Sequence, residues 1–107
     1  MPVRYVITTL KPGVNPEDYE RWVQEYDYKV AKTFPSLISY ATHRITGPIM
    51  GAEQAGWSYI ERIEVRNVEE YQRDLTSPAG QELIRQLYER YLDRPKNISF
   101  WTEVIEE

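Results

Sequence analysis

The stretch VRYVITTL, residues 3–10, decides the fold class, because its composition is typical of a β-strand that is apolar on both faces. Alternate side chains of a strand point to opposite sides, which here gives Val3, Tyr5 and Ile7 on one side and Val6 and Leu10 on the other. A strand with one face in water would alternate apolar and polar residues. We therefore expect both faces of the sheet that contains this strand to be covered.

The segment after this strand predicts one amphipathic helix with a defined start and a defined end. Asn15 is a favourable N-cap, and Pro16 suits the first helical position. Pro35 stops the helix. Between them, apolar side chains recur every three or four residues, namely Tyr19, Trp22, Val23, Tyr26, Val30 and Phe34. This stripe predicts that one side of the helix packs against the sheet.

Two more strands follow the helix. Residues 37–45 (LISYATHRI) and 57–65 (WSYIERIEV) are rich in β-branched and aromatic residues, and a connection with Gly and Pro, residues 46–56, lies between them. The order of elements so far is strand, helix, strand, strand.

A second helical region and a last strand complete the chain. Asn67 caps a short helix, and Ser77 followed by Pro78 starts a second one after a break. Residues 98–105 (ISFWTEVI) predict the fourth strand. The sequence therefore predicts an α+β, ferredoxin-like βαββαβ fold, with a four-stranded antiparallel sheet and helices on one face. At 107 residues, the chain is expected to form a single domain, residues 1–107.

The sheet face that lacks helices needs another cover. In residues 98–105, as in the first strand, bulky apolar side chains fall on both sides, Phe100 and Val104 on one and Trp101 and Ile105 on the other. A second copy of the same sheet is the simplest cover, which predicts a homodimer whose two helix-free sheet faces are buried in a shared barrel core. The alternative is a monomer with a mixed outer face.

Composition excludes several classes of protein. The 13 Lys and Arg residues against 17 Asp and Glu give a net charge of −4 with no basic stripe, so we expect no nucleic acid partner. No apolar run is long enough to span a membrane, and the first residues lack the layout of a secretory signal, so we expect a cytoplasmic protein. With no Cys and one His, neither a metal site nor a cofactor is expected.

His43 is the first candidate for catalysis, since histidine is the residue type that exchanges protons most readily near neutral pH. It shares its strand face with small residues, Ser39 and Ala41, which leave room for a ligand beneath the helices. Tyr40 and Thr42 face the opposite layer. A lone histidine on a strand is also compatible with a structural or surface role.

Asp27 and Glu61 are the other candidates for acid/base chemistry. Glu61 lies in a strand that we predict to be half-buried. There it either acts as a general base with a raised pKa or pairs with an arginine across the dimer. Pairing is the simpler interpretation. Asp27 lies just off the apolar stripe of the first helix, where it either orients a histidine or binds a polar group of a substrate. In that position an aspartate is also compatible with full solvation.

Several aromatic residues and one serine are candidates for binding a flat substrate. Trp22 and Tyr26 lie on the helical stripe, where core packing is the alternative role. Trp57 and Tyr59 share a strand face with Glu61, and Ser39 lies beside His43.

Three stretches resemble the dimeric α+β barrel superfamily, and within it the RedY-like (HapK) and EthD-like groups: WVQEYDYKVAKTFPSLISYATHRI (22–45), WSYIERIEV (57–65) and YQRDLTSPAG (71–80). The resemblance covers nearly the whole chain and lies in packing positions, so it implies the architecture more than the activity. It implies a mostly apolar cavity between the sheet and the helices. It also implies a role in secondary metabolism, because RedY-like members are associated with pathways that make pyrrole pigments.

Two functions follow from these observations. The first is a cofactor-independent enzyme that acts on a small aromatic or polyketide-like metabolite by acid/base chemistry, through cyclisation, isomerisation or dehydration. The second is a non-catalytic homodimer that binds a small-molecule ligand.

Overall fold

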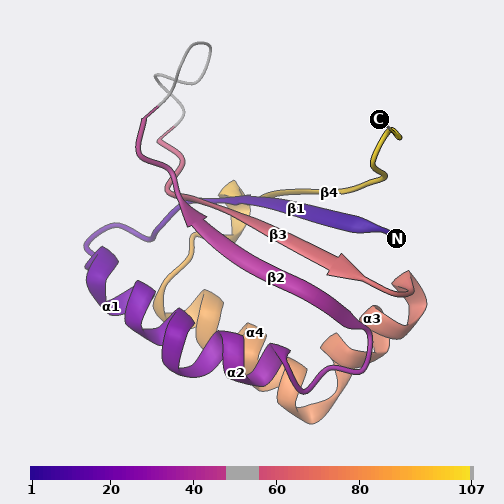
Figure 1. Ribbon diagram of the computed structural model, residues 1–107. Coiled ribbons are helices and arrows are strands. Elements are labelled where there is room, and N and C mark those ends of the chain that lie inside the picture. Colours follow the sequence, from indigo (N-terminus) through magenta and orange to yellow (C-terminus); the bar gives the residue numbers. More distant parts are fainter. Residues whose placement is uncertain (48–55, 107) are drawn as a thin grey trace.

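The computed structural model describes residues 1–47 and 56–106, so most of the predicted 46–56 connection lies outside the described residues (Figure 1). Four strands and two helical regions follow the predicted order. The elements are β1 (Val3–Thr8), α1 (Pro16–Trp22), the π-helical turn η1 (Val23–Asp27), α2 (Tyr28–Ala31), β2 (Leu37–Arg44), β3 (Tyr59–Val65), α3 (Val68–Thr76), α4 (Pro78–Arg90), the 3₁₀ turn η2 (Arg94–Lys96) and β4 (Ile98–Thr102).

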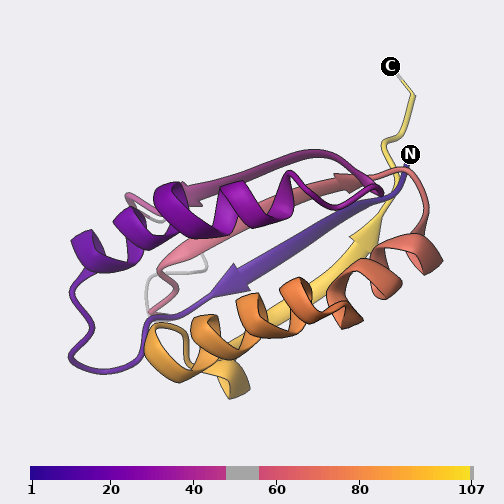
Figure 2. The ribbon, with the colours of Figure 1, turned by 90° about the horizontal axis from the view of Figure 1, so that it is seen from below.

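The four strands form one antiparallel sheet in the order β2-β3-β1-β4. All four α-helices lie on the same side of it (Figure 1). Seen from below, α1 and α2 run along the β2 and β3 half, and α3 and α4 run along the β1 and β4 half (Figure 2). The predicted α+β, ferredoxin-like arrangement with helices on one face is therefore confirmed.

The three predicted N-caps fix where the helices begin. The side-chain oxygen of Asn15 accepts a hydrogen bond from the Glu17 amide at 2.9 Å, and that of Asn67 accepts one from the Glu70 amide at 2.9 Å. Ser77 Oγ accepts one from the Gly80 amide at 3.2 Å and separates α3 from α4. Each cap satisfies an amide that has no partner inside the helix.

The last strand is shorter than predicted. β4 ends at Thr102, which pairs with Val3 at the start of β1, so the residues beyond Thr102 have no partner strand. Val104 and Ile105 accordingly are 69% and 90% exposed. The prediction of a strand to residue 105 is wrong, because apolar composition favours a strand but a neighbouring strand must supply its hydrogen bonds.

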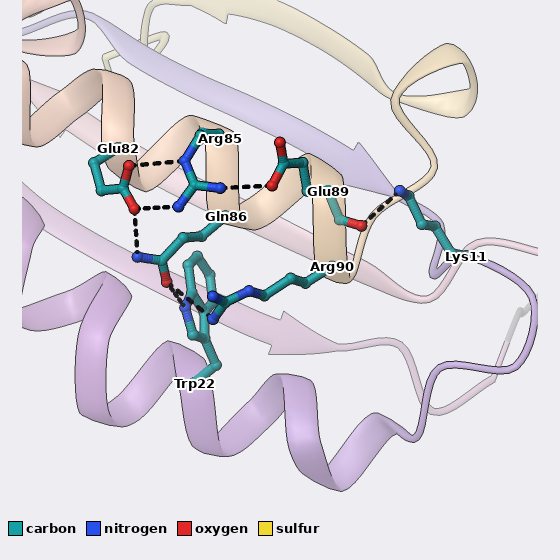
Figure 3. A network of polar contacts seen from close by, with 7 residues as sticks. All are labelled: Lys11, Trp22, Glu82, Arg85, Gln86, Glu89 and Arg90. Carbon is teal, nitrogen blue, oxygen red and sulfur yellow. Dashed lines mark hydrogen bonds and ion pairs between the residues drawn. The ribbon is translucent and has the colours of Figure 1, made fainter.

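The two helical regions are joined to each other by polar contacts as well as by packing (Figure 3). Trp22 Nε1 on α1 donates to Gln86 Oε1 on α4 at 3.0 Å. On the outer side of α4, Arg85 pairs with both Glu82 and Glu89. The Trp22–Gln86 hydrogen bond thus links α1 to α4, whereas the Arg85 pairs lie within α4 and make its outer surface charged.

The helix-free face of the sheet carries a row of apolar side chains. The strand register puts Tyr5, Ile7, Ile60, Ile98 and Phe100 on this face, which we call the open face. Ile98 and Phe100 are 43% and 46% exposed, and the rings of Tyr5 and Phe100 lie 6.4 Å apart. Apolar side chains on both sides of the sheet are therefore confirmed.

Candidate functional site

A cavity of about 230 Å³ lies between the sheet and both helical regions. Its wall is mostly apolar, with polar side chains at a few points. The residues that line it are Arg4, Val6, Asp27, Ala31, Phe34, Leu37, Tyr40, Glu61, Ile63, Tyr71, Leu75, Leu83, Ile84, Leu87, Tyr88 and Arg94. A mostly apolar cavity with a few convergent polar groups is the usual form of a small-molecule site.

The π-helical turn brings Asp27 into this cavity. The Tyr28 amide donates to the Val23 carbonyl, five residues back, so one extra residue is accommodated in the turn. The turn shifts the phase of the apolar stripe, and Asp27, which α-helical spacing places just off the stripe, is only 3% exposed. The interpretation of Asp27 as a solvated residue is therefore wrong, and its side chain lines the cavity.

Asp27, Tyr40 and Glu61 form a buried cluster at one end of the cavity. The Tyr40 Oη atom lies 2.6 Å from Asp27 Oδ2 and 2.6 Å from Glu61 Oε1. A phenol has one proton to donate, so it satisfies only one of these two contacts as a donor. The other contact requires a protonated carboxyl group that donates to the phenol oxygen. The geometry therefore implies that the two carboxyl groups hold one proton between them.

Burial and charge determine which carboxyl group keeps the proton. Burial raises the pKa of Asp27 from 3.8 to about 7, and the neighbouring Glu61 adds to the rise, while the Tyr40 hydrogen bond opposes it. Burial also raises the pKa of Glu61, but the Tyr40 hydrogen bond and the charge of Arg4 act in the opposite direction. We therefore assign the proton to Asp27 and the negative charge to Glu61 near neutral pH.

Arg4, Tyr71, Tyr88 and Arg94 supply the polar groups elsewhere on the cavity wall. Arg4 Nη1 donates to Tyr71 Oη at 3.1 Å, and Arg4 Nε donates to Ser99 Oγ at 2.8 Å. The guanidinium of Arg94 stacks on the Tyr88 ring, with 4.7 Å between its central carbon and the ring centroid. The cavity therefore has two cations in its wall as well as the carboxyl pair.

His43 and Ser39 lie away from this cavity. Ala41 pairs with Arg62 and His43 pairs with Ile60 on the open face, whereas Tyr40 and Thr42 point under the helices. The predicted division of β2 into two faces is confirmed, but the expectation that the His43 face lies beneath the helices is wrong. The reason is that strand alternation defines two faces without saying which one the helices cover.

Glu61 lies on the helix-covered face of β3, where it is 6% exposed. An arginine from a second sheet packed on the open face would lie on the other side of the backbone. The alternative of a buried carboxyl group with a raised pKa therefore fits this position, and pairing with an arginine across the dimer stays an untested prediction.

The aromatic candidates separate into a core cluster and a second hollow. Trp22 packs in the core, with its ring 5.6 Å from that of Tyr26, and neither residue lines the cavity. Tyr59 is 3% exposed and donates to Glu20 Oε2 at 2.7 Å. With His43, it lines a more polar hollow of about 350 Å³ at the edge of β2. Trp57 is half-buried just before β3 and does not line the cavity.

Tyr40 is the main residue of the candidate site that was not predicted from the sequence. The sequence indicated which side of β2 Tyr40 faces, but not which side chains it contacts. Glu61 comes close to Tyr40 because β3 pairs with β2 in a register that sets Glu61 opposite Thr42, and this register cannot be derived from either strand alone. Arg4, Tyr71 and Tyr88 were missed for a similar reason, since they lie on β1, α3 and α4 and meet only in the folded chain.

The described residues contain neither a cluster of metal-ligating side chains nor a membrane-spanning helix. Within residues 1–47 and 56–106, no three His, Asp or Glu side chains gather closely enough to hold a metal ion. None of the helices in this part of the chain is long and apolar enough to cross a membrane.

Comparison with solved structures supports the fold. A crystal structure of HapK from Hahella chejuensis matches with a TM-score of 0.80 and 19% identity, covering 100% of this chain and 95% of that one. Hydroxynitrile lyase from Passiflora edulis matches with a TM-score of 0.76 and 14% identity over 99% of this chain and 95% of its own. A dimeric ferredoxin-like protein of unknown function from Thermobifida fusca matches with a TM-score of 0.71 and 13% identity, covering 97% of this chain and 92% of that one.

Comparison with sequences identifies the family. A search of curated proteins returned no match. The family model described as REDY-like protein HapK matches residues 2–105, which is nearly the whole chain. The chain therefore belongs to the REDY-like HapK family.

Proposed function

We propose that the protein is a cofactor-independent enzyme that moves protons on a small, mostly apolar metabolite bound in the cavity, and so catalyses an isomerisation, cyclisation or dehydration. The observation that carries the proposal is the contact of Tyr40 Oη with both Asp27 and Glu61 at 2.6 Å. It supplies one protonated and one ionised carboxyl group on a cavity wall. An acid and a base at the same site are the minimum equipment for proton transfer.

The chemistry uses these three residues in defined roles. The Glu61 carboxylate removes a proton from a carbon next to a carbonyl group. The C–H electron pair forms a carbon–carbon double bond, and the π pair of the carbonyl group moves to its oxygen. The protonated Asp27 carboxyl, with Tyr40 as the intermediate carrier, delivers a proton to that oxygen. The product is an enol, with Glu61 protonated and Asp27 ionised. Glu61 then returns a proton to a carbon atom of the enol and the enol O–H returns its proton through Tyr40 to Asp27, which restores both groups. Positioned acid/base groups of this type accelerate reactions by about 100-fold to 10,000-fold.

The proposal includes a homodimer formed through the open face. Tyr5, Ile7 and Phe100 form part of an apolar row on that face, and burial of such a row against a second copy is the usual way to remove it from water. The similar protein from Thermobifida fusca is described as dimeric. Light scattering of the wild type in dilute solution should give twice the mass of one chain, and Phe100→Glu should give a single chain. A monomeric wild type would contradict this part of the proposal.

A single-domain organisation, a cytoplasmic location and a role in secondary metabolism belong to the same proposal. They are supported by the match of the REDY-like HapK family model to residues 2–105. One similar structure is a hydroxynitrile lyase, which supports catalysis on a small molecule by this fold without indicating the same reaction.

Hydrogen–deuterium exchange at carbon tests the proposed chemistry without knowledge of the natural substrate. Phenylacetone carries methylene protons next to a carbonyl group, and NMR in D2O follows their loss. We expect the wild type to accelerate this loss and Glu61→Gln to reduce the acceleration by about 100-fold or more. Asp27→Asn should reduce it as well, because it removes the proton donor.

Glu64→Gln is the matched control, since Glu64 lies on the same strand and on the open face. Its exchange rate should equal that of the wild type. His43→Gln distinguishes the two sites: loss of exchange in this variant with full retention in Glu61→Gln would move the chemistry from the cavity to the histidine. No acceleration by the wild type would favour the non-catalytic binding protein.

A further inference from the structure

We propose that the ligand of the cavity is a small ring-bearing carboxylic acid, whose carboxylate is held by Arg4, Tyr71 and Tyr88 with Arg94 at the entrance. This inference rests on the proposed function, because it names the substrate class of the same cavity. It is carried by the hydrogen-bonding groups of the wall, by their charge and by the size of the space.

Arg4 has donors to spare on the cavity wall. Two of its N–H groups are used, by Ser99 Oγ at 2.8 Å and Tyr71 Oη at 3.1 Å. A guanidinium carries five N–H groups in a planar fork that matches a carboxylate. The bonds to Ser99 and Tyr71 fix the orientation of this fork, so a ligand meets an arginine that is already positioned.

Tyr71 and Tyr88 each have a hydroxyl proton available. Tyr71 Oη accepts from Arg4, and Tyr88 Oη accepts from Asn97 Nδ2 at 2.8 Å. Neither hydroxyl donates to another group in the part of the chain that the structure describes. A phenol that already accepts one hydrogen bond still has its own proton to donate, so a hydrogen-bond acceptor is the partner that suits it. A carboxylate oxygen is such a group, because it can only accept.

The charged side chains of the cavity wall have a net charge of about +1 when Asp27 is protonated. Four residues with ionisable side chains of either charge line the cavity, namely Arg4, Arg94, Asp27 and Glu61. Neither arginine takes part in an ion pair with another described residue. Two arginines against one ionised glutamate give an excess of one positive charge while Asp27 keeps its proton. A ligand with a single negative charge neutralises this excess.

Arg94 is exposed on the 3₁₀ turn η2 and also borders a groove on the outside of α4. It therefore lies at the solvent side of the cavity, where a positive charge attracts an incoming anion. Arg4, by contrast, is half-buried and lies further inside.

The size of the space limits the rest of the ligand. An apolar cavity of about 150 Å³ holds one benzene molecule. The present cavity, at about 230 Å³, therefore has room for one ring with a short polar substituent. The ring contacts are supplied by Phe34, Leu83 and Leu87, among other apolar residues.

The register places the carboxylate site close to the acid/base pair. Arg4 pairs with Ile63, so Glu61 is its diagonal neighbour on the same face of the sheet. Diagonal neighbours have Cα and Cβ atoms about 7–8 Å apart. A carboxylate bound by Arg4 therefore puts the adjacent carbon atoms of the ligand next to Glu61, where proton removal takes place.

Binding of two matched compounds tests this inference. Phenylpyruvate and phenylacetone share the ring, the methylene and the carbonyl group, and differ in a carboxylate against a methyl group. Calorimetry at about pH 6.5, where Asp27 is mostly protonated, should give phenylpyruvate a Kd at least about tenfold lower. Arg4→Gln should abolish this preference. Arg94→Gln should raise the Kd of phenylpyruvate by a few fold and leave the Kd of phenylacetone unchanged.

Arg85→Gln is the control, because Arg85 lies on the outer side of α4 and pairs with Glu82 and Glu89 (Figure 3). It should keep the full preference. Since Arg4→Gln removes two internal hydrogen bonds, circular dichroism checks its fold, and the exposed Arg94 provides a variant that does not disturb folding. Equal binding of the two compounds, or a preference that survives both Arg4→Gln and Arg94→Gln, would overturn the inference.

The two proposals fail in different ways. Absence of a carboxylate preference, with deuterium exchange of phenylacetone still catalysed, would reject only the acid as the substrate class. A carboxylate preference without exchange would reject only the catalytic role.

Discussion

Replacing Asp27 by asparagine should make the protein more stable above pH 7 and flatten the dependence of its stability on pH. An asparagine side chain reproduces the protonated carboxyl group, because its amide donates to Tyr40 Oη while Tyr40 donates to Glu61. The variant cannot ionise, so it avoids the cost of a second buried negative charge beside Glu61.

The sign and the size follow from the pKa of Asp27, which is 3.8 in an unfolded chain and about 7 in the folded one. Between these values the unfolded state has released the proton and the folded state still holds it, so stability falls as the pH rises. Above pH 7 both states are ionised and the loss is complete. The gap of about 3 pKa units corresponds to a loss of up to about 4 kcal/mol.

Urea unfolding followed by tryptophan fluorescence, at intervals from about pH 4 to pH 8.5, measures this effect. The wild type should lose stability across that range, and Asp27→Asn should remove most of the slope. Asp18→Asn is the control, since Asp18 is exposed near the start of α1 and should leave the slope unchanged. Parallel curves for the wild type and Asp27→Asn would show that Asp27 is not held protonated, and the assignment of the acid would be wrong.

Three further changes test how the second helical region is held. Gly80→Ala should cost about 2–3 kcal/mol in urea unfolding, because its β-carbon would lie 2.5 Å from the Leu75 carbonyl oxygen; a cost below 0.5 kcal/mol would contradict this close packing. Ser77→Ala should cost about 1 kcal/mol through loss of the N-cap, and Ser77→Gly only a few tenths. Asp74→Asn should cost about 1–2 kcal/mol, since Asp74 Oδ2 accepts from both the amide and the hydroxyl of Ser36; no change would mean that these bonds do not stabilise the fold.

The elements of the fold were predictable because their signals are local. The caps at Asn15, Asn67 and Ser77 lie within three residues of the amides they satisfy, so sequence order alone identifies them. Strand composition worked for the same reason. It failed at Val104, where the missing partner strand is a property of the whole sheet and not of the segment.

The site was only partly predictable, because it depends on two non-local facts. Asp27 and Glu61 were candidates as isolated acids, but their approach to one phenol depends on the π-helical turn at Val23–Asp27 and on the register of Thr42 with Glu61. Neither can be derived from the spacing of apolar residues. The choice of His43 instead followed from its residue type and from the small residues on its strand face, and neither indicates which face the helices cover.

The buried carboxyl pair lowers the stability of the fold, and this cost indicates that the cavity has a function. Asp27 and Glu61 are buried at 3% and 6% exposure, and burial raises the pKa of both, so each opposes folding when it is ionised. Two apolar residues of similar volume would avoid this cost. A cavity that keeps acids where apolar packing is more stable is typical of a site selected for chemistry at the expense of stability.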